Sequence, residues 1–222
     1  MRLPLLAASD WGLAVAILVV FVLFLGAAWF IVQATRQQLY WRQRAAGGDV
    51  DAIRMMVEDE VARWKTMRMP KGYDTTTWRG VQTAELIDVA PAGVRVSAIA
   101  EGEYTTAGGE RREVSNSYRE ALKLTAKLAD MLMYDVPNVR LDDVRIDVYS
   151  TFRDEQAATQ RCIMTTTCTR DTAAELDWDE MDAEEIVRAC NGRYSLDDRG
   201  NALPIVIDAV RTSVPAVFYE DE

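Results

Sequence analysis

The chain has 222 residues, with 25 lysines and arginines against 35 aspartates and glutamates, so its formal net charge is −10 at pH 7. It contains no histidine, which excludes serine–histidine and cysteine–histidine catalysis, metal or haem ligation by histidine, and the usual pH switch near neutrality. Residues 171–222 carry most of the acidic surplus, with 14 acids and four arginines. That sign of charge disfavours nucleic acid as a partner, because binding phosphate requires basic surfaces.

A run of uncharged residues, 11–32, follows a short N-terminal tail of residues 1–10. The run contains 22 residues, 14 of them Leu, Ile, Val or Phe. As a helix it extends for about 33 Å, enough to cross the hydrocarbon core of a bilayer. A cleaved signal peptide is the alternative, because Leu25-Gly26-Ala27-Ala28 has the small residues of a cleavage site. The apolar run continues beyond that site to Val32, so the sequence predicts a transmembrane helix at 11–32.

The segment after this run, residues 33–48, is basic and is expected to lie at the membrane surface. Arg2 is the one basic residue before the run, and three arginines follow it. Since basic residues collect on the cytoplasmic side of a membrane, we predict a single-pass protein of the cell membrane, with its N-terminus outside and its C-terminal domain in the cytoplasm. The predicted membrane-interface residues, whose rings favour the headgroup layer and whose charges favour anionic lipid, are Arg36, Tyr40, Trp41, Arg42 and Arg44.

The remainder of the chain, 49–215 followed by a tail at 216–222, is predicted to form one cytoplasmic domain with an acidic C-terminal third, 171–222. Its first element is a helix over 50–67, since Asp49 is a good N-cap and apolar residues recur at spacings of three and four. Gly47-Gly48 before it is interpreted as a helix stop, with a hinge as the alternative. Two strand-like runs follow, 80–89 and 93–104, and the proline and glycine between them predict an antiparallel hairpin.

A second group of elements repeats this order of helix and hairpin. A helix is predicted over 115–134, and alternation of apolar and polar residues predicts a strand at 143–152. The threonine-rich run 161–170 predicts another strand, which pairs with the previous one as a second hairpin. A helix over 182–190 and a short strand over 203–206 complete the domain. Two hairpins separated by one amphipathic helix indicate the α+β class: an antiparallel sheet with flanking helices on one face.

No cluster of residues in the sequence predicts a catalytic, cofactor or metal site. Cys162 and Cys168 are six residues apart on one predicted strand, too far apart to hold one metal ion, and are expected to be buried small side chains. The odd total of three cysteines favours a reducing compartment. The acidic run that begins at Asp177 fails the EF-hand pattern and is expected to be a solvated surface, with weak binding of a divalent ion or of a basic partner as the alternatives. Asp147 and Glu101 are interpreted as ordinary outward-facing strand residues rather than as the carboxylates of a nuclease.

The sequence therefore favours a membrane-anchored interaction or accessory protein at the cytoplasmic face, for example a subunit of a membrane complex. Its expected partners are the lipid bilayer and another protein, with no cofactor. Gly12 and Ala16, four residues apart in the apolar run, also allow close packing of two copies, which would make a homo-oligomer. The alternative is a membrane-tethered ligand-binding sensor, or an enzyme that uses carboxylates or a metal without histidine. Catalysis is the less favoured of these functions.

Overall fold

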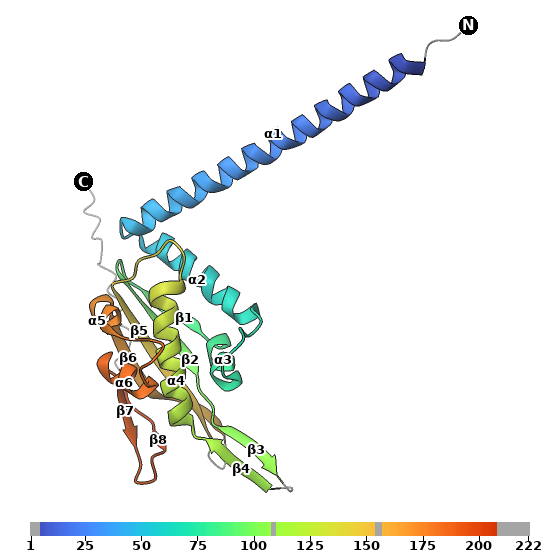
Figure 1. The fold of residues 1–222 in the computed structure, drawn as a ribbon. Coiled ribbons are helices and arrows are strands. Elements are labelled where there is room, and N and C mark those ends of the chain that lie inside the picture. The colour runs from blue at the N-terminus through green and yellow to red at the C-terminus, as the bar shows by residue number, and fades with distance from the viewer. Residues whose placement is uncertain (1–4, 108–109, 154–156, 208–222) are drawn as a thin grey trace, which may run out of the picture. The chain divides into compact units, whose positions relative to one another are not determined.

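The computed structural model describes residues 5–107, 110–153 and 157–207, and the chain divides into two units, Met1–Gly47 and Gly48–Glu222. The described residues of the first unit form one helix, α1 (Leu5–Ala46), which runs without interruption through 42 residues (Figure 1). It therefore begins within the predicted tail 1–10 and includes most of the basic segment 33–48. α1 is long and apolar enough to cross a membrane. The tail predicted at 216–222 lies outside the described residues.

Two glycines end α1, as the sequence predicted. The Gly47 N–H donates to two carbonyl oxygens of the last turn, at 3.0 and 3.1 Å. Gly48 adopts φ +78°, a left-handed conformation that is costly for residues with a Cβ. Asp49 then caps α2 (Val50–Thr66), because its side chain accepts hydrogen bonds from two N–H groups of the first turn, each at 3.1 Å. The predicted helix stop and the helix over 50–67 are both confirmed.

The apolar stripe of α2 faces the core of the second unit. The helix buries Ile53, Val57, Val61 and Trp64, which recur at the predicted spacings. Trp64 is fully buried, and its indole N–H donates to the Glu60 carboxylate at 2.7 Å, so the polar group of the ring is satisfied. Burying each large apolar side chain contributes about 1.5–3 kcal/mol. Packing, rather than helix propensity, is therefore the main source of stability for α2.

A short helix replaces part of the first predicted strand. α3 (Thr75–Gln82) begins after Asp74, whose side chain accepts from the Thr77 N–H at 3.2 Å, and strand β1 (Glu85–Val89) starts only after this helix. The prediction of a strand over 80–89 was therefore wrong for its first residues. The reason is tertiary: a Cβ at Gly80 would lie 2.7 Å from a methyl group of Leu124, so the glycine allows α3 to pack closely against the helix that contains Leu124.

The second unit is built on one six-stranded sheet with the order β1-β2-β5-β6-β7-β8 (Figure 1). The strands after β1 are β2 (Gly93–Ile99), β5 (Asp143–Arg153), β6 (Ala158–Thr169), β7 (Arg193–Leu196) and β8 (Ala202–Leu203). The two predicted hairpins are confirmed, since β1 pairs with β2 and β5 pairs with β6 in antiparallel register. β2 and β5, however, are parallel, so the sheet is mixed and the prediction of an antiparallel sheet was wrong. The physical reason is that a helix connects these two strands and returns the chain to the same end of the sheet.

The chain between β2 and that helix forms a separate two-stranded hairpin. Its strands are β3 (Glu103–Ala107) and β4 (Glu110–Ser115), which pair only with each other. Figure 1 shows this hairpin extending away from the sheet. The strand predicted over 93–104 is thus divided between β2 and the start of β3.

Helix α4 (Ser117–Asp130) covers one face of the sheet and supplies much of the core (Figure 1). Asn116 caps α4 by accepting from the Arg119 N–H at 3.0 Å, and the helix continues as a π-helical turn, Met131–Asp135, close to the predicted range of 115–134. A buried hydrogen bond joins helix and sheet, from the Thr125 hydroxyl to the Met164 sulfur at 3.3 Å. The fully buried apolar side chains of α4 and the sheet include Val96, Leu124, Leu128, Ile146 and Val148.

The last elements include two short helices, α5 (Arg170–Glu175) and α6 (Ala183–Ala189). α6 packs against α4 and confirms the helix predicted over 182–190. The strand predicted over 203–206 is shifted to β8, and the Ile205 N–H instead donates to the carbonyl oxygen of Cys162 at 2.8 Å.

Cys168 and Cys190 form a disulfide that the sequence did not predict. Cys168 lies near the end of β6 and Cys190 follows α6, 22 residues later, with their Cα atoms 4.3 Å apart. Cys162 and Cys168 are buried, as expected, Cys190 is buried as well, and Cys162 is the free one. The odd total is therefore no argument for a reducing compartment, because it is what remains after one pair has formed.

Replacing Leu128 with alanine tests the packing of α4 on the sheet. Because Leu128 is 0% exposed, Leu128→Ala should lower the free energy of unfolding by about 2–5 kcal/mol. Denaturant unfolding of the purified full chain, followed by tryptophan fluorescence, measures the change. The control is Ile87→Ala, since Ile87 is 40% exposed on β1 and its truncation should cost less than about 1 kcal/mol. Equal losses in the two variants would contradict the described core.

Candidate functional site

The C-terminal end of α1 carries every residue that the sequence assigned to the membrane interface. Arg36, Tyr40 and Arg44 follow one another at intervals of four and share one face of the helix, whereas Arg42 lies on another face. The Arg44 guanidinium donates to the Tyr40 hydroxyl at 3.3 Å and lies 5.8 Å from the ring centroids of both Tyr40 and Trp41. This cation–π cluster keeps positive charge at the surface of the helix.

The continuity of α1 decides how far these side chains lie from the apolar run. At 1.5 Å per residue, Arg36 is roughly 6 Å beyond Val32 along the helix axis, and Tyr40 is roughly 12 Å beyond it. The headgroup layer adds about 5–8 Å on each side of the hydrocarbon core. If the apolar run fills the hydrocarbon core, this spacing puts Arg36 within the headgroup layer and Tyr40 and Trp41 beyond its outer edge, and the interface assignment of these residues stays a prediction.

Two tryptophans of α1 have the spacing of an aromatic belt, a signal that the sequence-based prediction did not use. Trp11 and Trp29 are 77% and 64% exposed. They are 18 residues apart on one helix, which is about 27 Å along its axis and close to the thickness of the hydrocarbon core. Tryptophan is enriched at both membrane–water interfaces, so these two residues have interface geometry in addition to Arg36.

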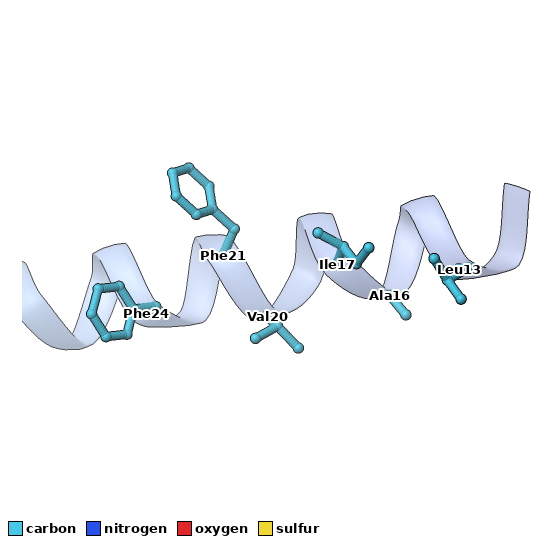
Figure 2. A pocket seen from close by; sticks show the side chains of 6 residues that line it. All are labelled: Leu13, Ala16, Ile17, Val20, Phe21 and Phe24. Atoms are coloured by element: carbon cyan, nitrogen blue, oxygen red, sulfur yellow. The ribbon is translucent and has the colours of Figure 1, made fainter. Parts of the chain in front are cut away.

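Between these tryptophans, α1 presents a shallow apolar face (Figure 2). The face is formed by side chains at spacings of three and four, which are Leu13, Ala16, Ile17, Val20, Phe21 and Phe24. Ala16 is its one small residue. A Cβ built on Gly12, the other residue of the predicted packing pair, meets nothing within 4 Å. Open space at Gly12 in a single chain does not test whether two copies pack closely through this pair, so that packing stays a prediction.

In the second unit, a groove of about 400 Å³ lies between α4 and the segment that contains α6, and we call it the α4–α6 groove. Aromatic and sulfur-containing side chains line it, namely Tyr73, Trp178 and Met181, together with the buried Ile186. The Trp178 indole N–H donates to the Ala173 carbonyl at 3.1 Å. This hydrogen bond holds the ring in place, so the groove has one large preorganised apolar wall.

Two lysines of α4 line the same groove, and carboxylates neutralise both. Lys127 Nζ is 2.6 Å from the Asp130 carboxylate and 4.9 Å from the centroid of the Tyr73 ring, and Lys123 Nζ is 3.0 Å from the Glu120 carboxylate. Burial by itself lowers the pKa of Lys127, but hydrogen bonds to Asp130 and Tyr73 raise it by more, so the net pKa lies above its usual value. The groove therefore presents paired charges and no free cationic site at these positions.

The rim of the groove is acidic. Residues 171–187 contain eight acids and no lysine or arginine. Asp177 organises the loop, because its carboxylate accepts from two N–H groups at 3.2 Å. The next three carboxylates, Asp179, Glu180 and Asp182, are exposed and form no ion pair with the described residues, and we call them the acidic rim. Within the same described part of the chain, no group of three His, Cys, Asp or Glu side chains is placed to hold a metal ion.

Asp147 is buried rather than outward-facing in solvent, which corrects the sequence-based interpretation. It is 1% exposed, and its carboxylate accepts from Arg95 Nε at 2.5 Å, Arg145 Nε at 3.3 Å and the Thr165 hydroxyl at 2.5 Å. These bonds join β2, β5 and β6 and neutralise the charge, so the cluster has a structural role. Glu101 likewise accepts two hydrogen bonds from one threonine of β5, at 3.2 and 2.6 Å.

Comparison with protein-family models, with curated proteins and with solved structures finds no match for this chain. The geometry alone therefore defines its candidate surfaces, which are the basic end of α1 and the α4–α6 groove. The sequence pointed to the first and missed the second. Trp178 was the one available signal, because a large ring within a solvated acidic run needs a surface to pack against.

The free thiol of Cys162 should make the free energy of unfolding depend on pH. Burial, and to a lesser extent the charge of Asp147, raises the pKa of Cys162 from its usual value of 9.0 to about 11. Between these two values the folded chain holds a proton that the unfolded chain has lost, so this thiol makes the free energy of unfolding fall as the pH rises from 9 to 11. In Cys162→Ser this contribution is absent, and the variant should lose less stability over the same window. Denaturant unfolding at several pH values measures both slopes, and identical slopes would contradict the assignment.

Proposed function

We propose that this chain is a membrane-anchored accessory protein in which α1 crosses the cell membrane once and the α+β unit binds another protein at the cytoplasmic face. The observation that carries the proposal is the apolar part of α1. Its Leu, Ile, Val and Phe side chains favour insertion by about 4–8 kcal/mol in total. They are exposed in the isolated chain, with Leu23 and Phe24 at 68% and 69%. A continuous apolar surface of this size is typical of contact with lipid or protein.

The distribution of arginines supports the cytoplasmic placement of the second unit. Three arginines follow the apolar run and one precedes it, and basic residues favour the cytoplasmic side. The Cys168–Cys190 disulfide argues for the opposite side, because disulfides persist mainly in oxidising compartments. The proposal follows the arginines, and labelling of introduced cysteines tests this choice against the disulfide.

In this placement the residues at the ends of the apolar run have distinct roles. Trp11 and Trp29 mark the two membrane interfaces, and Arg36 lies in the headgroup layer of the inner leaflet. Arg42 and the cluster of Tyr40, Trp41 and Arg44 lie beyond it, near enough for arginines to attract anionic lipid at about 1 kcal/mol each.

Two arginines in the middle of the apolar run should release the chain from the membrane. Each arginine near the helix centre costs about 2.5–3.5 kcal/mol, so Val19→Arg with Val20→Arg offsets most or all of the favourable insertion energy. Fractionation followed by alkaline carbonate extraction measures the effect, with the wild-type chain expected in the membrane pellet. The matched control is Val19→Leu with Val20→Leu, which should stay in the pellet. A wild-type chain in the soluble fraction would refute the anchor.

The orientation is tested with introduced cysteines, because the native cysteines are buried. In a Cys162→Ser background, Asp59→Cys places a thiol on the exposed surface of α2, and Ser9→Cys places one before the apolar run. A membrane-impermeant maleimide should label Ser9→Cys in intact cells and Asp59→Cys only after permeabilisation, as seen by a mass shift on a gel. Labelling of Asp59→Cys in intact cells would place the second unit outside and would agree with the disulfide.

A further inference from the structure

We infer that the α4–α6 groove binds the basic end of α1 from a second copy of this chain. The inference deepens the proposed function and rests on it, because the anchor is what confines two copies to one face of a membrane. The occupant is the helical segment 33–46, which carries arginines beside exposed apolar side chains.

In the proposed placement, the end of α1 has exposed apolar side chains that lie outside the bilayer. Leu39 and Tyr40 are 50% and 53% exposed. They lie about 10–12 Å beyond Val32 along the helix axis, past the headgroup layer. Spacings of three and four place them on the same side of the helix as Arg36 and Arg44. These four residues, Arg36, Leu39, Tyr40 and Arg44, form what we call the arginine face, and it is complementary to a surface that is both apolar and acidic.

The α4–α6 groove provides the apolar part of such a surface. Tyr73, Trp178 and Met181 line it, and its volume of about 400 Å³ accommodates anchoring side chains rather than a whole helix. Aromatic residues and methionine are enriched at the centres of protein interfaces. Leu39 and Tyr40 of the arginine face are anchors of matching size and chemistry, as in other complexes in which a helix lies over an apolar groove.

The acidic rim provides the complementary charge. Asp179, Glu180 and Asp182 have no basic partner in the described part of the chain, whereas segment 33–46 has three arginines and no acid. The lysines of the groove do not oppose a basic ligand, because each is paired with its own carboxylate. The same rim disfavours a phosphate or an acidic peptide, so the electrostatics select a basic segment.

Confinement to a membrane allows a contact of modest affinity to hold two copies together. Two copies anchored in one membrane meet at a much higher effective concentration than free copies do. If each groove receives the helix end of the other copy, the two contacts are equivalent and the pair is closed. The groove and its occupant thus come from one sequence, and the inferred assembly is a reciprocal dimer.

The primary test is a titration of a fluorescein-labelled peptide of residues 33–46 with the full chain in detergent, followed by fluorescence anisotropy. The chain carries Arg36→Gln, Arg42→Gln and Arg44→Gln, so that its own segment does not compete. We expect saturable binding that weakens at least about tenfold in Trp178→Ala and in the combined rim variant Asp179→Asn, Glu180→Gln and Asp182→Asn. The rim variant should keep the fold, because Asp182 makes no side-chain capping bond to α6.

Matched controls separate the rim from net charge. Asp59→Asn, Glu85→Gln and Asp198→Asn together remove the same number of exposed carboxylates elsewhere on the unit and should leave binding unchanged. A peptide with the three arginines replaced by glutamine should bind at least about tenfold more weakly. No saturable binding, or equal weakening by the rim and control variants, overturns the inference. Because the titration is done in detergent, such a result leaves the carbonate extraction and the labelling of the anchor unaffected.

Cross-linking in membranes distinguishes a second copy from the same chain. Tyr40→Cys is placed in a copy with one tag and Met181→Cys in a copy with another, and both are expressed together in a Cys162→Ser background. Oxidation should produce a band of twice the chain mass that carries both tags. If the two cysteines cross-link only when they are in one chain, the second copy is excluded as the occupant.

Discussion

The burial of one face of the sheet under α4 is the contact on which the rest of the α+β unit depends. Leu128 of α4 and Val96 and Ile146 of the sheet are all 0% exposed. Because α4 also connects β2 to β5, the same helix covers the sheet and makes these two neighbouring strands parallel. α6 packs on α4 in turn, and the α4–α6 groove lies between them. The core and the α4–α6 groove therefore lie on two faces of the same helix, α4.

The buried cluster around Asp147 complements this packing with a polar constraint. Arg95 and Asp147 lie on neighbouring parallel strands, and Thr165 adds a bond from β6. A shift of one residue between strands would send these side chains to opposite faces of the sheet and leave a buried charge without a partner. Apolar contacts on one face give the sheet its stability, and this cluster favours a single register.

The local patterns in the sequence predicted the elements that depend on neighbouring residues. The stripe from Ile53 to Trp64 sufficed for α2, and alternation sufficed for β5, because each pattern reports which side chains of one element face the core. The threonine content of 161–170 sufficed for β6. α3 was missed because its place depends on Gly80 meeting Leu124. The candidate site divides in the same way. The end of α1 was predicted from contiguous charges and rings, whereas the groove brings together Tyr73 and Trp178, 105 residues apart.

The sequence by itself determined that the chain begins with a helix apolar enough for a membrane, that basic residues follow it, and that an acidic α+β unit completes it. Composition and periodicity are properties of contiguous residues, so no knowledge of distant contacts was needed. Only the tertiary structure decided that α1 continues through Tyr40 and Arg44, that β2 and β5 are parallel, that Cys168 meets Cys190, and that Trp178 closes a groove on α4. Most of these outcomes depend on which distant segments of the chain come into contact. The length of α1 depends on whether the helix continues beyond its apolar part. A local sequence pattern contains no information on either point.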